Sequence, residues 1–209
     1  MSKIQQISAK RCGTSLLQNI IEHMGIVVAK SHVIIPAKGF VVSAIRDPRN
    51  NAISINRFSL LRKKSLSYDL TTEEGVIKLS KNVFLKNNLN VMKKTYKLFH
   101  NKPNAHVFRY EDFYNNYEHV IRIIGTKLSI PVDEELIQTI NTSLMFDKMK
   151  SESDKSNSVK SKFVSKKYRI HGQHIGDDVS PGQWKRKVPK ELHELYDNSF
   201  KSYCEFLNY

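Results

Sequence analysis

Hydrophobic residues along this chain fall into short runs that alternate with longer amphipathic stretches. Four runs have the length of single strands, and they lie at 4–9, 26–30, 40–45 and 105–110. Elsewhere apolar residues recur every three or four positions, a spacing that places them on one face of a helix. The helices predicted in this way span 14–24, 48–62, 73–100, 117–128, 133–144 and 189–207. This alternation predicts a three-layer α/β/α fold with a mostly parallel sheet.

One segment, from Lys148 to His171, departs from the alternation. It contains six serines, eight lysines or arginines and two acidic residues, with little apolar periodicity. Such a composition is typical either of a mobile basic loop or of a disordered insertion without a role. The whole chain has 209 residues, enough for a sizeable core, so we expect a single domain over 1–209.

The charge balance is strongly basic, since 34 lysines and arginines against 20 acidic residues give a net charge of +14. This excess fits either a well-solvated surface or a polyanionic ligand. Nucleic acid is not expected as a partner, because no nucleic-acid-binding motif occurs. No apolar run approaches the roughly 18 residues that span a bilayer. The two cysteines, Cys12 and Cys204, lack metal-binding spacing, and with no signal-peptide core they favour a cytoplasmic setting.

The first predicted strand runs through a short polar loop into a helix. The loop is Lys10-Arg11-Cys12-Gly13-Thr14-Ser15. A corner of this kind points backbone N–H groups and the positive end of the helix dipole at one place. Two cations and two hydroxyl groups beside it favour a phosphate or a sulfate as the occupant. The loop is not a Walker A motif, because it has one glycine and no Gly-Lys pair.

Further polar residues follow the other predicted strands. Lys30 and His32 come after the second, Arg46 and Ser54 after the third, and Tyr110 closes the fourth. Each alone has an ordinary explanation, such as a polar loop residue or a residue packed at a strand end. Because ligands of parallel α/β sheets bind at the carboxyl ends of the strands, these residues together predict one site. Its ligand would carry two separated anionic groups and a planar ring.

In this order the motifs resemble those of the sulfotransferases that use 3′-phosphoadenosine 5′-phosphosulfate (PAPS). The first loop matches the family's phosphosulfate loop, and Lys30-Ser31-His32 stands for its K-T-H. Arg46 and Ser54 have the eight-residue spacing of its 3′-phosphate clamp. Three later matches are Tyr110-Glu111-Asp112 for Y-E-D, Phe146 to Lys150 for F-x-x-M-K, and Gly182 to Lys185 for G-x-W-K. The resemblance therefore runs from about residue 7 to 185.

The resemblance implies a P-loop-like sulfotransferase fold, PAPS or its product 3′,5′-ADP (PAP) as cofactor, and no metal. It implies that His32 is the catalytic base, that Arg11 with Lys10 offsets the charge of the leaving nucleotide, and that Lys30 contacts the sulfuryl oxygens. The implied cofactor-binding residues are Lys10, Arg11, Cys12, Gly13, Thr14, Ser15, Arg46, Ser54, Tyr110, Phe146, His174, Gly176, Trp184 and Lys185.

The chain also departs from the family pattern. Cys12 replaces the usual serine, Leu16 replaces a common aromatic residue, and the connection from His32 to Arg46 is short. The Arg-Lys-Gly that holds the 3′-phosphate is absent. Its place could be taken by His171, His174 or Arg169, and the sequence does not choose among them.

The resemblance leaves the acceptor open. A small molecule or a glycan bearing a hydroxyl or an amine would fit, and the basic segment could close over the site.

Two other functions compete with sulfuryl transfer. One is a P-loop nucleoside-phosphate kinase, which lacks support because Arg46 stands where a metal-binding acid might be. The other is a non-catalytic binder of sulfated or phosphorylated ligands.

Overall fold

The core of the protein is a parallel sheet of four strands, and its order is β2-β1-β3-β4. The structure is a computed structural model that describes residues 3–36, 39–61, 67–154, 175 and 178–209. The strands are β1 (Lys3–Ile7), β2 (Val27–Ser31), β3 (Phe40–Ile45) and β4 (Ala105–Arg109). All three pairings between neighbours are parallel, which confirms the sheet predicted from the sequence.

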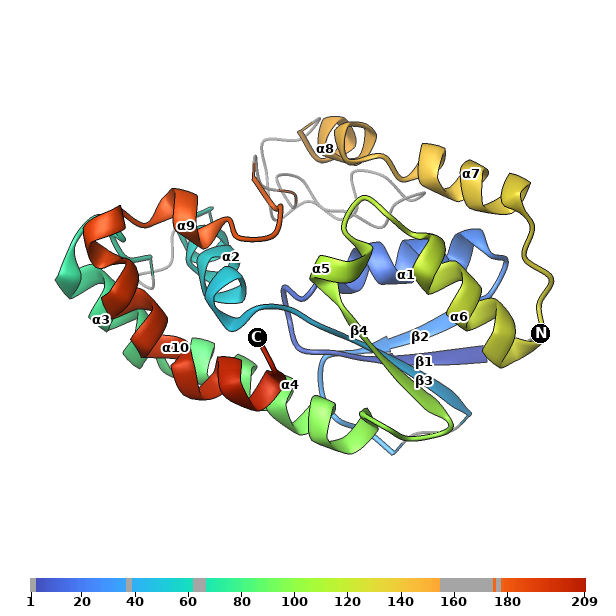
Figure 1. Cartoon of the computed structure of the whole chain (residues 1–209), viewed down its shortest axis with the longest axis horizontal. Helices are drawn as coiled ribbons and strands as arrows, with labels where there is room; N and C mark the ends of the chain where they lie inside the picture. The colour runs from blue at the N-terminus through green and yellow to red at the C-terminus, as the bar shows by residue number, and fades with distance from the viewer. Residues whose placement is uncertain (1–2, 37–38, 62–66, 155–174, 176–177) are drawn as a thin grey trace.

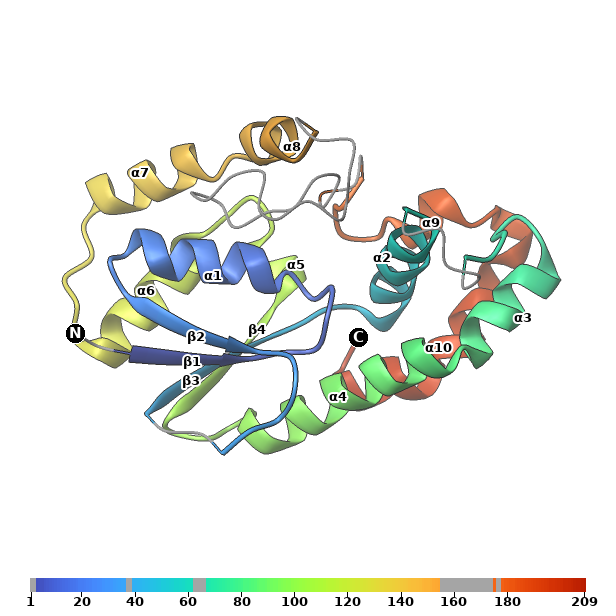
Figure 2. The same ribbon diagram turned by 180° about the vertical axis from the view of Figure 1, so that it is seen from behind.

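Helices cover both faces of the sheet and extend beyond the carboxyl ends of its strands. Figures 1 and 2 show α1 and α6 on one face, α4 on the other, and α2, α3 and α9 past the strand ends. The helices are α1 (Thr14–His23), α2 (Pro48–Leu61), α3 (Glu73–Lys81), α4 (Val83–Phe99), α5 (Tyr110–Phe113), α6 (Glu118–Leu128), α7 (Glu134–Ser143), α8 (Phe146–Asp154), α9 (Trp184–Lys187) and α10 (His193–Leu207), with a 3-10 turn η1 (Lys190–Leu192).

The burial of the strands follows their place in the sheet. β3 is flanked by β1 and β4, and its residues from Val41 to Ile45 are all buried. Edge strand β2 is partly open, with Val27 about half exposed. The apolar stripe of α1, which includes Leu17, Ile20 and Ile21, is buried in the same core. The continuous hydrophobic run of β3 is typical of a strand covered on both faces.

Two predictions about chain organisation were wrong in detail. The helix predicted over 73–100 is divided at Asn82, whose extended backbone ends α3 and whose side chain caps α4 through the Leu85 N–H at 2.9 Å. An asparagine favours this role because its side-chain oxygen replaces the missing helical acceptor. The basic segment predicted as a loop from Lys148 begins in helix α8, which runs to Asp154. Its residues 155–171 lie outside the described residues, and so does any closure over the site.

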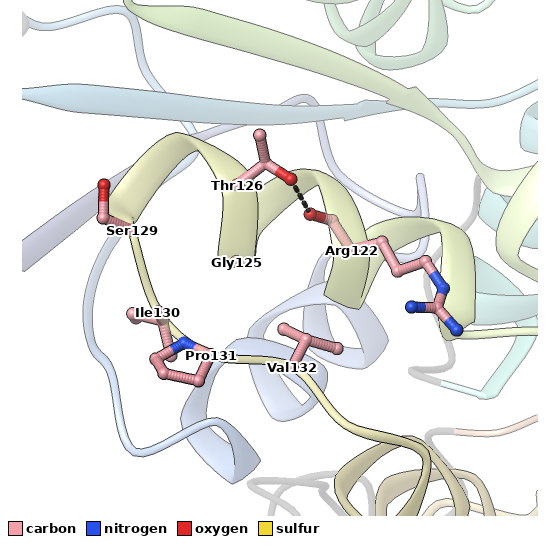
Figure 3. Close-up of a pocket in the computed structure, with 7 residues that line it drawn as sticks. All are labelled: Arg122, Gly125, Thr126, Ser129, Ile130, Pro131 and Val132. Atoms are coloured by element: carbon pink, nitrogen blue, oxygen red, sulfur yellow. Dashed lines mark hydrogen bonds between the residues drawn. The ribbon is translucent and has the colours of Figure 1, made fainter.

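A small pocket lies where α6 turns toward α7, close to the amino ends of the strands (Figures 1 and 3). Its lining runs from Arg122 to Val132 and encloses about 380 Å³. Gly125 allows the returning chain to approach α6, because a Cβ there would lie 2.3 Å from the Val132 side chain. The pocket is therefore a packing feature of the α6–α7 connection, away from the carboxyl ends of the strands.

Candidate active site

The loop between β1 and α1 forms a corner with the geometry of an anion site. Arg11 and Gly13 both have positive φ angles, of 63° and 77°, which turn the backbone sharply into α1. The first α1 hydrogen bond runs from the Leu17 N–H to the Gly13 carbonyl at 2.9 Å. The N–H groups of residues 14–16 therefore precede the helical ladder and remain available to a ligand. The first turn of α1 carries no acidic residue to compete for them.

Gly13 also permits a close approach between this corner and α5. A Cβ at Gly13 would lie 2.4 Å from Cδ2 of Tyr110 and 3.2 Å from Phe113. The two rings are buried and pack edge to face against each other. The glycine is thus required twice, once for its φ angle and once for the missing side chain. The corner and the end of β4 are held together as one unit.

Two buried asparagines fix the backbone of Lys10. Asn88 accepts from the Lys10 N–H at 2.8 Å, and both Asn88 and Asn51 donate to the Lys10 carbonyl at 3.0 Å. The adjacent Cys12 thiol is fully buried and lies 3.8 Å from the sulfur of Met92. Burial raises the pKa of Cys12 to about 12, so the thiol stays protonated. Its side chain packs in the core and leaves only the Cys12 backbone facing the corner.

Arg11 connects the corner to α2. Its Nε donates to Ser54 Oγ at 3.0 Å, across 43 positions of sequence, and its guanidinium lies 5.1 Å from the ring centre of Phe58. Burial, together with the positive charges of Arg57 and Arg46, lowers the pKa of Arg11 to about 10. Guanidinium groups that destabilise one another in this way favour an anion between them.

Arg46 lies at the end of β3 and is only 3% exposed. Its guanidinium stacks over the Tyr110 ring at 4.3 Å, and Nη2 donates to the Val179 carbonyl at 2.9 Å. Its buried Nε has no hydrogen-bond partner among the described residues. A buried donor left open on a charged group is costly unless a ligand accepts from it. Arg46 is therefore a candidate anion ligand.

Lys30 and His32 extend the site along the end of β2. Lys30 Nζ donates to Ser15 Oγ at 3.2 Å, and Nδ1 of His32 lies 3.0 Å from the Ser8 carbonyl. A carbonyl can only accept, so Nδ1 carries the proton and Nε2 has a free lone pair. Burial lowers the pKa of His32 below 6.5, and the charges of Lys30 and Lys10 add to the shift, although the Ser8 hydrogen bond opposes it. His32 is thus neutral at pH 7, as a general base must be.

The remaining predicted site residues are not all placed near this corner. Phe146 begins α8, but its side chain lies outside the described residues, as do His174 and Gly176. Trp184 is 5% exposed and stacks on Tyr196 at 5.6 Å, so its ring is a core element. Lys185 is exposed, with Nζ 5.7 Å from the Trp184 ring. His171 and Arg169, the other possible substitutes for Arg-Lys-Gly, also lie outside the described residues.

The G-x-W-K segment instead supports α2. Gln183 donates to the Asn50 carbonyl at 3.1 Å, and the Trp184 N–H donates to Asn50 Oδ1 at 3.2 Å. Asn50 lies in the first turn of the helix that carries Ser54. The segment therefore holds the start of α2 in place from a position more than 130 residues away in sequence.

Sequence reasoning missed one candidate site residue, Arg57, and the contact made by a residue it had named, Glu111. Arg57 lies three residues after Ser54, on the same side of α2, and its charge acts on Arg11. That spacing was a usable signal, because residues three apart on a helix are neighbours. Glu111, the middle residue of the Y-E-D match, accepts from the Asp47 N–H at 3.1 Å. Nothing in the local sequence pointed to this contact.

The described part of the chain contains no cluster of three or more His, Cys, Asp or Glu residues suited to a metal ion. It also contains no helix long and apolar enough to cross a membrane. Cys12 and Cys204 are both free and buried.

The parallel sheet and the anion corner after β1 define a P-loop-like α/β protein. A family model described as "Sulfotransferase domain" matches residues 37–205, and the chain belongs to this family. The match begins after the anion corner and His32, so these two features depend on the structure and on the motif resemblance. A search of curated proteins found no significant match.

Solved structures extend the likeness over nearly the whole chain. Mouse sulfotransferase SULT7A1 complexed with PAP is 16% identical, with a TM-score of 0.65, over 97% of this chain and 84% of that one. Retinol dehydratase with retinol and PAP is 14% identical, with a TM-score of 0.65, over 97% of this chain and 81% of that one. The same enzyme with androsterone and PAP is 14% identical, with a TM-score of 0.62, over 97% of this chain and 80% of that one. The fold is that of the sulfotransferases.

Proposed function

We propose that this protein transfers a sulfuryl group from PAPS to a hydroxyl or amine acceptor. The observation that carries the proposal is the Arg11–Ser54 hydrogen bond of 3.0 Å. It joins the corner suited to a 5′-phosphosulfate to the Arg46–Ser54 pair suited to a 3′-phosphate. The family match and the PAP-bound structural neighbours support the same donor.

The residues present fit PAPS in charge. Arg46 has an open buried Nε, and the charges of Arg57 and Arg46 both act on Arg11, so this cluster of cations suits a ligand with two anionic groups. We assign the 5′ end to the N–H groups of residues 14–16 with the hydroxyls of Thr14 and Ser15, and the 3′-phosphate to Arg46 and Ser54. Arg57 joins this clamp in place of the absent Arg-Lys-Gly, because its charge already acts on Arg11.

The proposed mechanism needs one base and a fixed set of positive charges. When bound, PAPS supplies an activated sulfuryl group and leaves as 3′,5′-ADP. Nε2 of His32 takes the proton of the attacking hydroxyl or amine. Arg11 and Lys30 stabilise negative charge around the transferring group, and the rigid corner supplies this field without reorganisation.

The acceptor is a small molecule or a glycan. The two retinol dehydratase structures named above hold retinol or androsterone, which supports the small-molecule class. The net charge of +14 supports an anionic glycan, although an anionic donor accounts for part of that charge. A cytoplasmic location stays a prediction.

A transfer assay tests the proposal. The protein is incubated with PAPS labelled in its sulfuryl group and a panel of phenols, alcohols, amines and glycans. We expect label in one acceptor class, and we expect His32→Ala to abolish transfer while binding 3′,5′-ADP as tightly as the unaltered protein.

Unchanged turnover in His32→Ala would remove His32 from the role of base. Tight 3′,5′-ADP binding without transfer to any acceptor would instead favour the non-catalytic binder.

A further inference from the structure

The ladder between β3 and β4 ends just before the residues that form the site. Its last register pair joins Ile45 to Arg109. Arg46 and Tyr110 directly follow these two strands. Their stacked side chains therefore project from backbone that makes no β3–β4 ladder hydrogen bonds. The Arg46 N–H contacts only a weak acceptor in the described structure, the sulfur of Met92 at 3.5 Å.

Glu111 continues the link where the ladder stops. Its Oε1 accepts from the backbone N–H of Asp47 at 3.1 Å. Asp47 directly follows Arg46, and Glu111 directly follows Tyr110. One carboxylate therefore ties together the two strand ends that carry the Arg46–Tyr110 stack. The side chain of Asp47 is occupied elsewhere, since it binds the backbone and guanidinium of Arg49.

The second oxygen of Glu111 is held by Tyr209. The Tyr209 hydroxyl donates to Oε2 at 2.7 Å. A buried carboxylate needs hydrogen bonds on both oxygens to stay charged and in one position. Burial raises the pKa of Glu111 above its usual value, and the Tyr209 hydroxyl, the Asp47 N–H and the charge of Arg46 offset part of that rise. The Tyr209 hydroxyl therefore helps to keep the Glu111 carboxylate charged and in one position.

Tyr209 is itself fixed against the end of β4. Asn208 ends α10 with a φ of 59°, and the Tyr209 N–H donates back to the Cys204 carbonyl at 2.9 Å, a helix-ending motif. The Arg109 guanidinium lies 4.6 Å from the Tyr209 ring centre and donates to the Leu207 carbonyl at 2.8 Å. Figure 1 shows this end of the chain beside the carboxyl ends of the strands.

We propose that Tyr209 is a positioning residue of the nucleotide site. Its hydroxyl orients Glu111, Glu111 fixes the Asp47 N–H, and this contact sets the direction in which Arg46 leaves β3. The inference rests on the proposed function, because it takes Arg46 as a ligand of the 3′-phosphate. Tyr209 then contributes to the preference for a nucleotide that carries a 3′-phosphate.

Calorimetric titration with 3′,5′-ADP and 5′-AMP tests this role, because the two nucleotides differ only in the 3′-phosphate. Tyr209→Phe removes one hydroxyl and should weaken 3′,5′-ADP binding about tenfold, the equivalent of one hydrogen bond to a charged group. Its affinity for 5′-AMP should not change. Tyr203→Phe is the matched control, because that hydroxyl contacts Asn90 at 3.4 Å on the exposed side of α10, and both affinities should stay the same.

A second variant guards against a folding defect in Tyr209→Phe. Glu111→Asp keeps the charge but is too short to reach both partners, so it should show the same selective loss. The role of Tyr209 would be overturned if both variants kept the ratio of 3′,5′-ADP affinity to 5′-AMP affinity found in the unaltered protein, including the case in which both affinities fall equally. If the unaltered protein itself does not prefer 3′,5′-ADP over 5′-AMP, the proposed function fails, and this inference fails with it.

Discussion

At the scale of single residues, the proposed chemistry depends on the protonation of His32. Only the neutral imidazole can accept a proton, so kcat/KM should rise as pH increases through the pKa of this residue. Because burial and the charges of Lys30 and Lys10 lower that pKa, the midpoint of the acid limb should lie below 6.5.

Substitution of Lys30 tests the same point. Lys30→Met removes a positive charge that opposes imidazolium, so the midpoint should move to higher pH even if the rate also falls. Lys201→Met, an exposed lysine on α10, should leave the midpoint unchanged. A midpoint above 6.5, or one that Lys30→Met does not move, would contradict this view of His32.

Single residues also show where sequence reasoning stops. The loop from Lys10 to Ser15 was recognisable from its composition, but the direction of each side chain was not. Cys12 lies between Arg11 and Gly13, yet its thiol faces Met92, about 80 positions away. Such an orientation is set by packing against α4, which local sequence does not encode.

At the scale of elements, the close approach of α1 and α5 is the most sensitive feature of the site. Gly13→Ala introduces a strained φ and a Cβ that meets the Tyr110 ring. We expect a loss of about 3 kcal/mol in the free energy of unfolding, together with weaker 3′,5′-ADP binding. Denaturant unfolding and nucleotide titration measure the two effects.

Gly25→Ala is the control for the strain alone. Gly25 has a similar φ of 75°, but a Cβ there has nothing within 4 Å. We expect it to cost about 1 kcal/mol and to leave nucleotide binding intact. If Gly13→Ala and Gly25→Ala lost the same free energy of unfolding, the clash with the Tyr110 ring would add nothing to the cost of the strained φ.

The order of elements was largely predictable, whereas their ends were not. Four apolar runs and their alternation with amphipathic helices predicted the parallel sheet, because the spacing of apolar residues reflects which positions are buried. The break at Asn82 was missed because α3 and α4 are both amphipathic and no glycine or proline separates them. Tyr110 was predicted to close β4 but begins α5.

At the scale of the whole molecule, the fold collects cations from distant segments at one edge of the sheet. Arg11, Arg46 and Arg57 come from the first loop, β3 and α2, and Val179 lies 133 positions after its partner Arg46. The rule that ligands bind at the carboxyl ends of parallel strands predicted this convergence. It could not predict Arg57 or Tyr209, whose positions depend on how α2 and α10 pack.

The stability of the folded protein in the presence of nucleotides tests the donor site most directly. A ligand at a hundredfold excess over its Kd adds about 2.7 kcal/mol. We expect 3′,5′-ADP to raise the melting temperature clearly more than ADP or ATP with magnesium, because only 3′,5′-ADP places phosphates on both Arg11 and Arg46. Equal or greater stabilisation by ATP with magnesium would contradict a PAPS site and favour a nucleoside-phosphate kinase.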